Sequence, residues 1–205
     1  MFDDVAPFSD GGTAQEDSSS APAGPAYTSF ADFPGEELLY AEYGASPYRL
    51  RLKTVDTAWG VELADRVAAA GTHVLVIYIA VTGEAADRGV ENVSLTYNDF
   101  ELRFPAAGDA CGPGEIDTFT SECALPPKVI TRPETVADNA WHEQRWGDAA
   151  SSVDPSLDAG GTLIAAVAFE VADDVGLPAD TAFCAAIADR LTRDNCLAVT
   201  APPLG

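Results

Sequence analysis

The chain has 205 residues, with 33 acidic and 11 basic side chains and a net charge of −22. So acidic a surface repels phosphate backbones and anionic lipid headgroups, which argues against nucleic-acid binding and membrane-surface binding. The length predicts one domain with or without a tail, and a hydrophobic fraction of 47% is enough for a core. The scarcity of lysine suits a high-salt or high-GC organism.

Residues 1–26 are mainly Asp, Ser, Gly, Pro and Ala, which cannot bury enough apolar surface to offset their ordering entropy. We predict a flexible leader or tether here, ahead of a folded domain over residues 27–205. The alternative is an arm that orders on a neighbouring subunit through Phe2, Val5 and Phe8. No secretory signal is visible after Met1, so either a signal has been removed or the protein leaves the cell by another route, such as within a virion.

The sequence THVLVIYIAVTG, residues 72–83, contains an unbroken apolar run rich in β-branched residues. Eight apolar residues are too few to span a bilayer, which needs about 20. They predict a central strand buried on both faces. Further strands are expected within residues 36–43, 48–63, 91–104, 160–171 and 196–201.

In the second of these, Arg49, Arg51 and Lys53 alternate with apolar residues, which predicts a strand with one wet face. The three cations could form a local anion site, although pairing with neighbouring carboxylates is the simpler interpretation. One or two helical turns are expected over residues 62–70. Within residues 91–104 the apolar phase shifts at Asn98–Asp99, which predicts a β-bulge.

The connection from Pro105 to Ala159 is long and rich in proline and glycine, so it is predicted to be irregular. It contains the sequence WHEQRW, in which Trp141, His142, Arg145 and Trp146 form a candidate interface if they are exposed. If they are buried, the indoles simply cover one end of the core, which is the interpretation we favour. After the strand at 160–171, we expect a short C-terminal helix capped by Asp180. Its buried stripe would comprise Phe183, Ile187 and Leu191.

Four cysteines are present, and none lies in a zinc-binding pattern. Cys111 and Cys123 are 12 positions apart, as are Cys184 and Cys196. The matched spacings predict two disulfides and hence an oxidising compartment, although spacing alone does not settle the connectivity.

The order of these segments, with VSLTYNDFELRF after the central strand and LDAGGTLIAAVAFEVADDVG much later, resembles a known family. It is similar to immunoglobulin-like domains of unknown function in secreted bacterial proteins and lipoproteins, related in fold to a secreted mycobacterial immunogenic protein. The resemblance covers roughly residues 48–173 and implies an all-β, immunoglobulin-like antiparallel β-sandwich outside the cell. The long connection, the cysteine pairs, the C-terminal helix and the lack of a lipid-anchoring cysteine depart from that family.

Sequence patterns for catalysis are missing: there is no G-x-S-x-G, no H-E-x-x-H and no phosphate-binding loop. We therefore expect no enzyme activity, no catalytic residues and no cofactor. Asp173–Asp174 and Asp154 with Asp158 are candidates for weak Ca²⁺ binding, although solvated loop acids are the simpler interpretation. The sequence predicts a non-enzymatic module for protein–protein contact at the cell surface. The alternative is a structural subunit of an extracellular assembly, such as a virion, surface layer or filament sheath.

Overall fold

A computed structural model describes residues 27, 29–42, 48–91, 93–105, 116–117, 121–136, 140–147, 149–173, 176–188 and 190–203. The described chain is all-β, as predicted, and its strands pair antiparallel in two large sheets and two small ones. Its helical segments are short 3-10 turns: η1 (Phe30–Asp32), η2 (Tyr97–Asp99), η3 (Ala140–His142) and η4 (Arg193–Asn195). The predicted leader, residues 1–26, lies outside the described residues.

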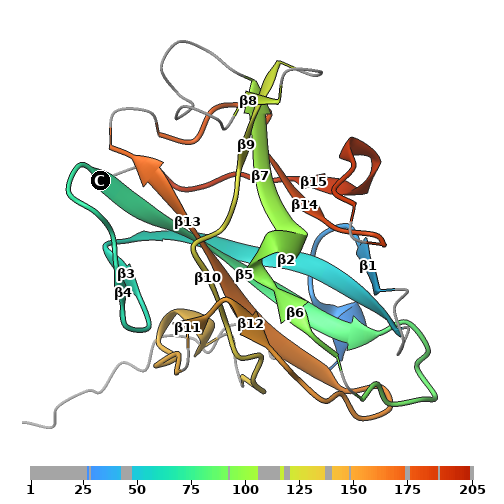
Figure 1. The fold of residues 1–205 in the computed structure, drawn as a ribbon. Helices are drawn as coiled ribbons and strands as arrows, with labels where there is room; N and C mark the ends of the chain where they lie inside the picture. The colour runs from blue at the N-terminus through green and yellow to red at the C-terminus, as the bar shows by residue number, and fades with distance from the viewer. Residues whose placement is uncertain are drawn as a thin grey trace, which may run out of the picture.

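The larger sheet has six strands in the order β1-β2-β5-β13-β10-β11. Its strands are β1 (Leu38–Glu42), β2 (Tyr48–Gly60), β5 (Thr72–Gly83), β13 (Thr162–Ala172), β10 (Val129–Thr131) and β11 (Ala149–Ala150). The predicted central strand is confirmed, because β5 is hydrogen-bonded to β2 on one side and to β13 on the other. In Figure 1, these three long strands run across the middle of the molecule.

The smaller sheet has five strands in the order β15-β14-β7-β9-β8. Its strands are β15 (Cys196–Ala198), β14 (Ala182–Ala185), β7 (Phe100–Pro105), β9 (Glu122–Leu125) and β8 (Ile116–Asp117). Two-stranded pairs join β3 (Glu62–Leu63) to β4 (Arg66–Val67) and β6 (Leu95–Thr96) to β12 (Ser152–Val153). The strands of the smaller sheet cross those of the larger one (Figure 1).

Both faces of the larger sheet are buried, which explains the unbroken apolar run of β5. On one face, Leu75, Ile77 and Ile79 belong to a core cluster that includes Leu102 and Phe183 of the smaller sheet. This face therefore packs the two large sheets together, and each fully buried aliphatic side chain contributes about 2 kcal/mol of transfer free energy.

On the other face, Val74, Val76, Tyr78 and Ala80 belong to a second core cluster. That cluster contains no strand of the smaller sheet. It is completed from η1, β3 and the segment around η3, by Phe30, Phe33, Leu63, Trp141 and Trp146 among others. We call this side of the larger sheet the outer face.

The predicted C-terminal helix is wrong. Ala182–Ala185 is strand β14, hydrogen-bonded to β7 on one side and β15 on the other. Asp180 has a φ of +66°, whereas an N-cap residue needs an extended backbone. Phe183 and Ala185 face the core at strand spacing, so pairing with two neighbours overrides the helical spacing of the apolar residues.

Three smaller predictions are also corrected. The expected helical turns at 62–70 are the β3–β4 hairpin. The expected bulge at Asn98–Asp99 is the 3-10 turn η2, which separates β6 and β7 into different sheets. The connection from Pro105 to Ala159 is not wholly irregular, because β8 to β12 lie within it.

Candidate interaction surface

The β3–β4 hairpin and the residue before it carry the large hydrophobic side chains that are exposed in the described part of the chain. These are Val61 and Val67, which are 61% and 70% exposed. Leu63, by contrast, is buried in the outer-face cluster, so the hairpin is fixed to the sheet through one side. Ala64, in the turn, has a φ of +55°.

Glu170 of β13 fixes the base of this hairpin. Its Oε1 accepts hydrogen bonds from the Ala69 amide (2.8 Å) and from Thr72 Oγ1 (2.7 Å). Its Oε2 lies 3.6 Å from Lys128 Nζ. The hydrogen bond from Thr72 lowers the pKa of Glu170, and the Ala69 amide and Lys128 act in the same direction against a smaller effect of burial.

A groove of about 430 Å³ lies between this hairpin and the end of the larger sheet. Most of its lining is apolar: Leu63, Val67, Ala68, Val74, Tyr97, Val129, Ala150, Ala168 and Phe169. The charged side chains in the lining are Arg66, Lys128 and Glu170, so their sum is +1. We call this groove, with Val61 and Val67, the hairpin groove.

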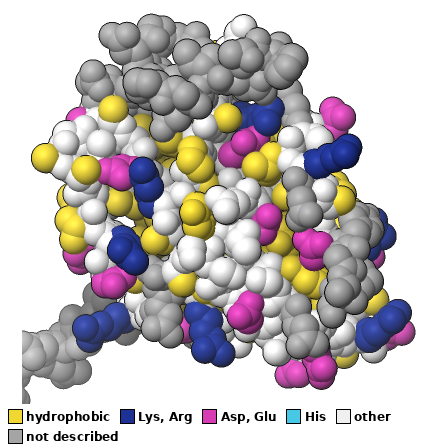
Figure 2. Space-filling model, viewed as in Figure 1, with side chains coloured by type: hydrophobic (Ala, Val, Ile, Leu, Met, Phe, Trp, Pro, Cys, Tyr) yellow, Lys and Arg dark blue, Asp and Glu magenta, His cyan; other side chains and the backbone are white. Residues whose placement is uncertain are grey.

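The charge of the hairpin groove contrasts with that of three other surface grooves. The lining of one includes Glu36 and Asp56, and that of another includes Glu91 and Asp158, so each sums to −2. In the third, two arginines balance two glutamates. Figure 2 shows basic and acidic side chains interspersed with apolar ones on the face where β10 and β11 lie. An apolar groove with two cations in its lining is thus set in a strongly acidic protein.

The candidate interface at WHEQRW divides between interior and surface. Trp141 and Trp146 are buried in the outer-face cluster, as the favoured interpretation expects, whereas His142 and Arg145 are exposed. Trp146 Nε1 donates to the backbone carbonyl of Trp141 (3.2 Å), which ties the Trp146 indole to the backbone of η3.

Asp56 of β2 attaches this segment to the sheet. It accepts hydrogen bonds from His142 Nε2 (2.7 Å), Trp141 Nε1 (3.3 Å) and the Thr57 amide (2.8 Å). Burial alone would raise the pKa of Asp56, but these hydrogen bonds, with the nearby His142, lower it overall. The hydrogen bonds from Trp141 and His142 to Asp56 hold η3 against the sheet.

The three basic residues predicted on one wet strand face differ in environment. Arg49 pairs with Glu84 (2.9 Å) and Arg51 with Glu37 (3.4 Å), in agreement with the simpler interpretation. Lys53 is buried, contrary to the prediction, and its Nζ donates to the Phe33 carbonyl (2.8 Å). The sequence did not reveal that the segment around η1 covers this part of β2.

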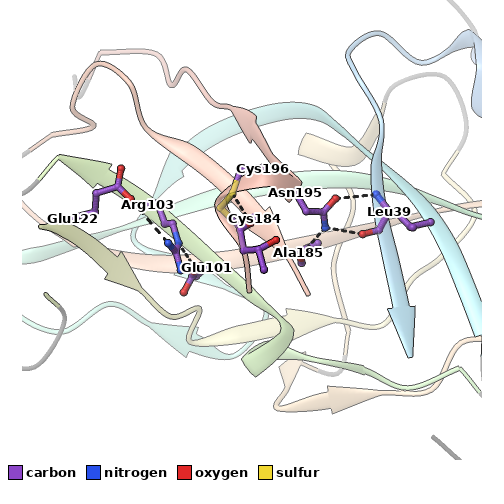
Figure 3. The surroundings of a disulfide bond; sticks show 9 residues. Leu39, Glu101, Arg103, Glu122, Cys184, Ala185, Asn195 and Cys196 are labelled. Atoms are coloured by element: carbon purple, nitrogen blue, oxygen red, sulfur yellow. Dashed lines mark hydrogen bonds and ion pairs between the residues drawn. A yellow bond between two sulfur atoms is a disulfide. The ribbon is translucent and has the colours of Figure 1, made fainter. Parts of the chain in front are cut away.

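Cys184 and Cys196 form one of the two predicted disulfides and lie opposite each other on β14 and β15. Figure 3 shows this bond between two polar groups: Arg103 with Glu101 and Glu122, and Asn195 with Leu39 and Ala185. Cys111 lies outside the described residues, so its pairing with Cys123 stays a prediction. The described part of the chain contains no free cysteine.

Among the described residues there is neither a metal-binding cluster nor a membrane-spanning helix. They contain no group of three or more His, Cys, Asp or Glu side chains arranged to hold a metal ion. Of the Ca²⁺ candidates, Asp173 pairs with His73 Nδ1, and Asp174 is outside the described residues. No helix of the described chain has the length and apolar character needed to cross a membrane.

Comparison of the chain with models of protein families, with curated proteins and with solved structures gives no match. The hairpin groove is therefore the feature of the chain that bears on its function. Sequence reasoning missed this site because its parts, from Leu63 to Glu170, are assembled by strand pairing across more than 100 positions. The local signal of the site was the pair Val61 and Val67 on either side of Arg66. It was overlooked because residues 62–70 were interpreted as helical.

Proposed function

We propose that this chain is a non-enzymatic, extracellular module with an immunoglobulin-like β-sandwich fold, and that it makes protein–protein contacts through the hairpin groove. The observation that carries the proposal is the exposure of Val61 and Val67 beside an apolar groove with Arg66 and Lys128 at its rim. Exposed apolar surface surrounded by polar groups is typical of a contact site.

The fold part of the proposal is supported by two antiparallel sheets that share one core cluster. The extracellular part is supported by the Cys184–Cys196 disulfide, because such bonds persist mainly in oxidising compartments. The non-enzymatic part rests on the sequence patterns and on the structural role of the Asp56–His142 pair.

A photo-crosslinking residue at Val67 tests this function in the cells that produce the protein. The matched control carries the same residue at Arg88, an exposed position that lines a different groove. We expect a discrete cross-linked protein product from the Val67 position and not from the Arg88 position. Equal or absent cross-linking at the two positions would show that the hairpin groove is not a contact surface.

The second candidate function is a structural subunit of an extracellular assembly, such as a virion, surface layer or filament sheath. It is favoured by the chemical match between the hairpin groove and the sequence FDDVAPFSD, residues 2–10, in which Phe2, Val5 and Phe8 are interspersed with acidic residues. Assemblies of this kind would use the N-terminal segment as an inter-subunit arm. Both candidates place the contact in the same groove, and they differ in the partner.

A further inference from the structure

We infer that the hairpin groove binds residues 2–10 of a second copy of this chain. The inference rests on the proposed contact function of the groove and names its occupant. It combines three observations: the apolar lining, the two cations at the rim and the pattern of the N-terminal sequence.

The groove suits an occupant with apolar side chains, and its rim cations can also accept carboxylates. Its walls bring together Val67 of the hairpin, Val74 of β5 and Ala168 of β13. Arg66 and Lys128 provide the cations of the rim, with side chains 64% and 58% accessible. Each also lies near one carboxylate, Asp65 at 3.8 Å and Glu170 at 3.6 Å, respectively. Exposed cations beside an apolar wall favour carboxylates that flank an apolar anchor.

Residues 2–10 have this chemistry. Phe2, Val5 and Phe8 recur every three residues, and Asp3, Asp4 and Asp10 lie between and after them. A polyproline II segment has three residues per turn, so these three apolar side chains would share one face. Pro7 favours an extended conformation for the residue before it. Extended peptides with apolar side chains at this period dock in grooves in just this way.

The described chain also fixes the face from which the arm departs. Tyr27 stacks on Phe33 (4.5 Å between ring centroids) and on Trp141 (5.9 Å), both in the outer-face cluster. Val74 and Ala168, which line the groove, belong to the same cluster. Tyr27, from which the N-terminal segment continues, and the groove therefore lie on the same side of the larger sheet.

The connector is long enough for exchange between two copies. Residues 11–26 span up to about 55 Å when extended. A compact domain of this size is roughly 40 Å across. Two copies whose outer faces meet about a two-fold axis would each supply one arm and one groove, and this reciprocal contact closes on itself.

Cross-linking between labelled copies tests the occupant. The full chain carrying a photo-crosslinking residue at Phe8 is mixed with ¹⁵N-labelled full chain in about 0.15 M salt, where repulsion between the acidic copies is screened beyond roughly 8 Å. We expect mixed-isotope cross-links that map to the hairpin or to the segment around Lys128. Cross-links within one chain, cross-links elsewhere or none at all would overturn the inference.

A charge exchange provides the second test. Arg66→Glu with Lys128→Glu should weaken dimerisation about tenfold by light scattering, because exposed pairs contribute modestly. Adding Asp3→Lys and Asp4→Lys to the same chain should restore it. Arg88→Glu, which changes an exposed charge in another groove, should leave dimerisation unchanged. Failure of the restoring substitutions would contradict charge complementarity in the groove.

These tests separate the two proposals. If Val67 cross-links to a different protein and Phe8 never reaches the groove, the contact surface stands and the occupant is wrong. If neither position gives the expected product, both proposals fall.

Discussion

At the scale of single residues, two charged side chains, Lys53 and Glu170, hold neighbouring segments together through hydrogen bonds. Lys53 Nζ donates to the Phe33 carbonyl and lies over the Phe30 ring, 5.0 Å from its centroid, and so ties the segment around η1 to β2. Glu170 ties the hairpin to β13. Among the 33 acidic residues of the chain, Glu170 is thus one with a defined structural role.

Glu170→Gln should lower the free energy of unfolding at pH 7 by about 1 kcal/mol, because charge-assisted hydrogen bonds become neutral ones. The pKa of Glu170 is lowered from 4.5 in the folded state. Its contribution to stability is therefore present above pH 4.5 and is lost as the pH falls through the folded pKa. Urea denaturation between pH 3 and pH 7 measures this, and the difference between wild type and variant should shrink in acid.

The matched control is Glu143→Gln, which removes the charge of an exposed glutamate in the segment after η3. It should leave the pH profile of unfolding close to that of the wild type. A Glu170→Gln variant whose stability difference from wild type stayed constant down to pH 3 would contradict the assigned role.

At the scale of elements, the edge of the larger sheet is closed by the chain that follows β14. Asn195 makes two hydrogen bonds to the backbone of Leu39 in β1, donating to the carbonyl (2.7 Å) and accepting from the amide (3.3 Å). Asn195 Nδ2 also donates to the Ala185 carbonyl (2.6 Å), as Figure 3 shows. Ala41 exchanges backbone hydrogen bonds with Ala186 and Ala188. Covered edges of this kind resist strand-to-strand aggregation.

Asn195→Ala should destabilise the fold by about 2 kcal/mol, because it leaves backbone groups of β1 and β14 without these partners. It should also promote aggregation by uncovering the edge of β1. Chemical denaturation and light scattering measure the two effects. Asn98→Ala, in the exposed turn η2, is the matched control and should change neither. Equal behaviour of the two variants would contradict the role given to Asn195.

The disulfide acts on the same region, because Cys196 follows Asn195 directly. Replacing both Cys184 and Cys196 by alanine should lower the free energy of unfolding by about 2–3 kcal/mol, mainly because the unfolded chain gains conformational entropy without the cross-link. Urea denaturation of the native and substituted proteins measures the difference. Alkylation of native, unreduced protein should leave both thiols unmodified, and modification of these two residues would contradict the bond.

At the scale of the whole molecule, the net charge of −22 opposes both folding and association. Screening by salt should therefore raise the melting temperature by roughly 5 °C between low salt and about 1 M NaCl. Calorimetry measures the change, and KCl should act like NaCl if screening is the cause. A melting temperature that is independent of salt would show that the carboxylates are spaced too far apart to repel strongly.

Much of the strand framework followed from the sequence alone, because its signals are local. The apolar run of β5 and the alternation of apolar residues in β13 indicate which faces of these strands are buried. The spacing of Cys184 and Cys196 indicated that they pair. The phase shift at Asn98–Asp99 was also visible, although its cause was a 3-10 turn. In each case the residues that carry the signal are neighbours in the chain.

Tertiary structure alone decided what lies against these strands. Phe183, Ile187 and Leu191 have the spacing of a helical face. Pairing with β7 and β15 nevertheless makes Ala182–Ala185 a strand. Lys53 became buried because residues 30–33 fold over it. The hairpin groove exists only where β3 and β4 meet β10, β11 and β13, and no local pattern encodes a surface built from strand pairs so far apart in the chain.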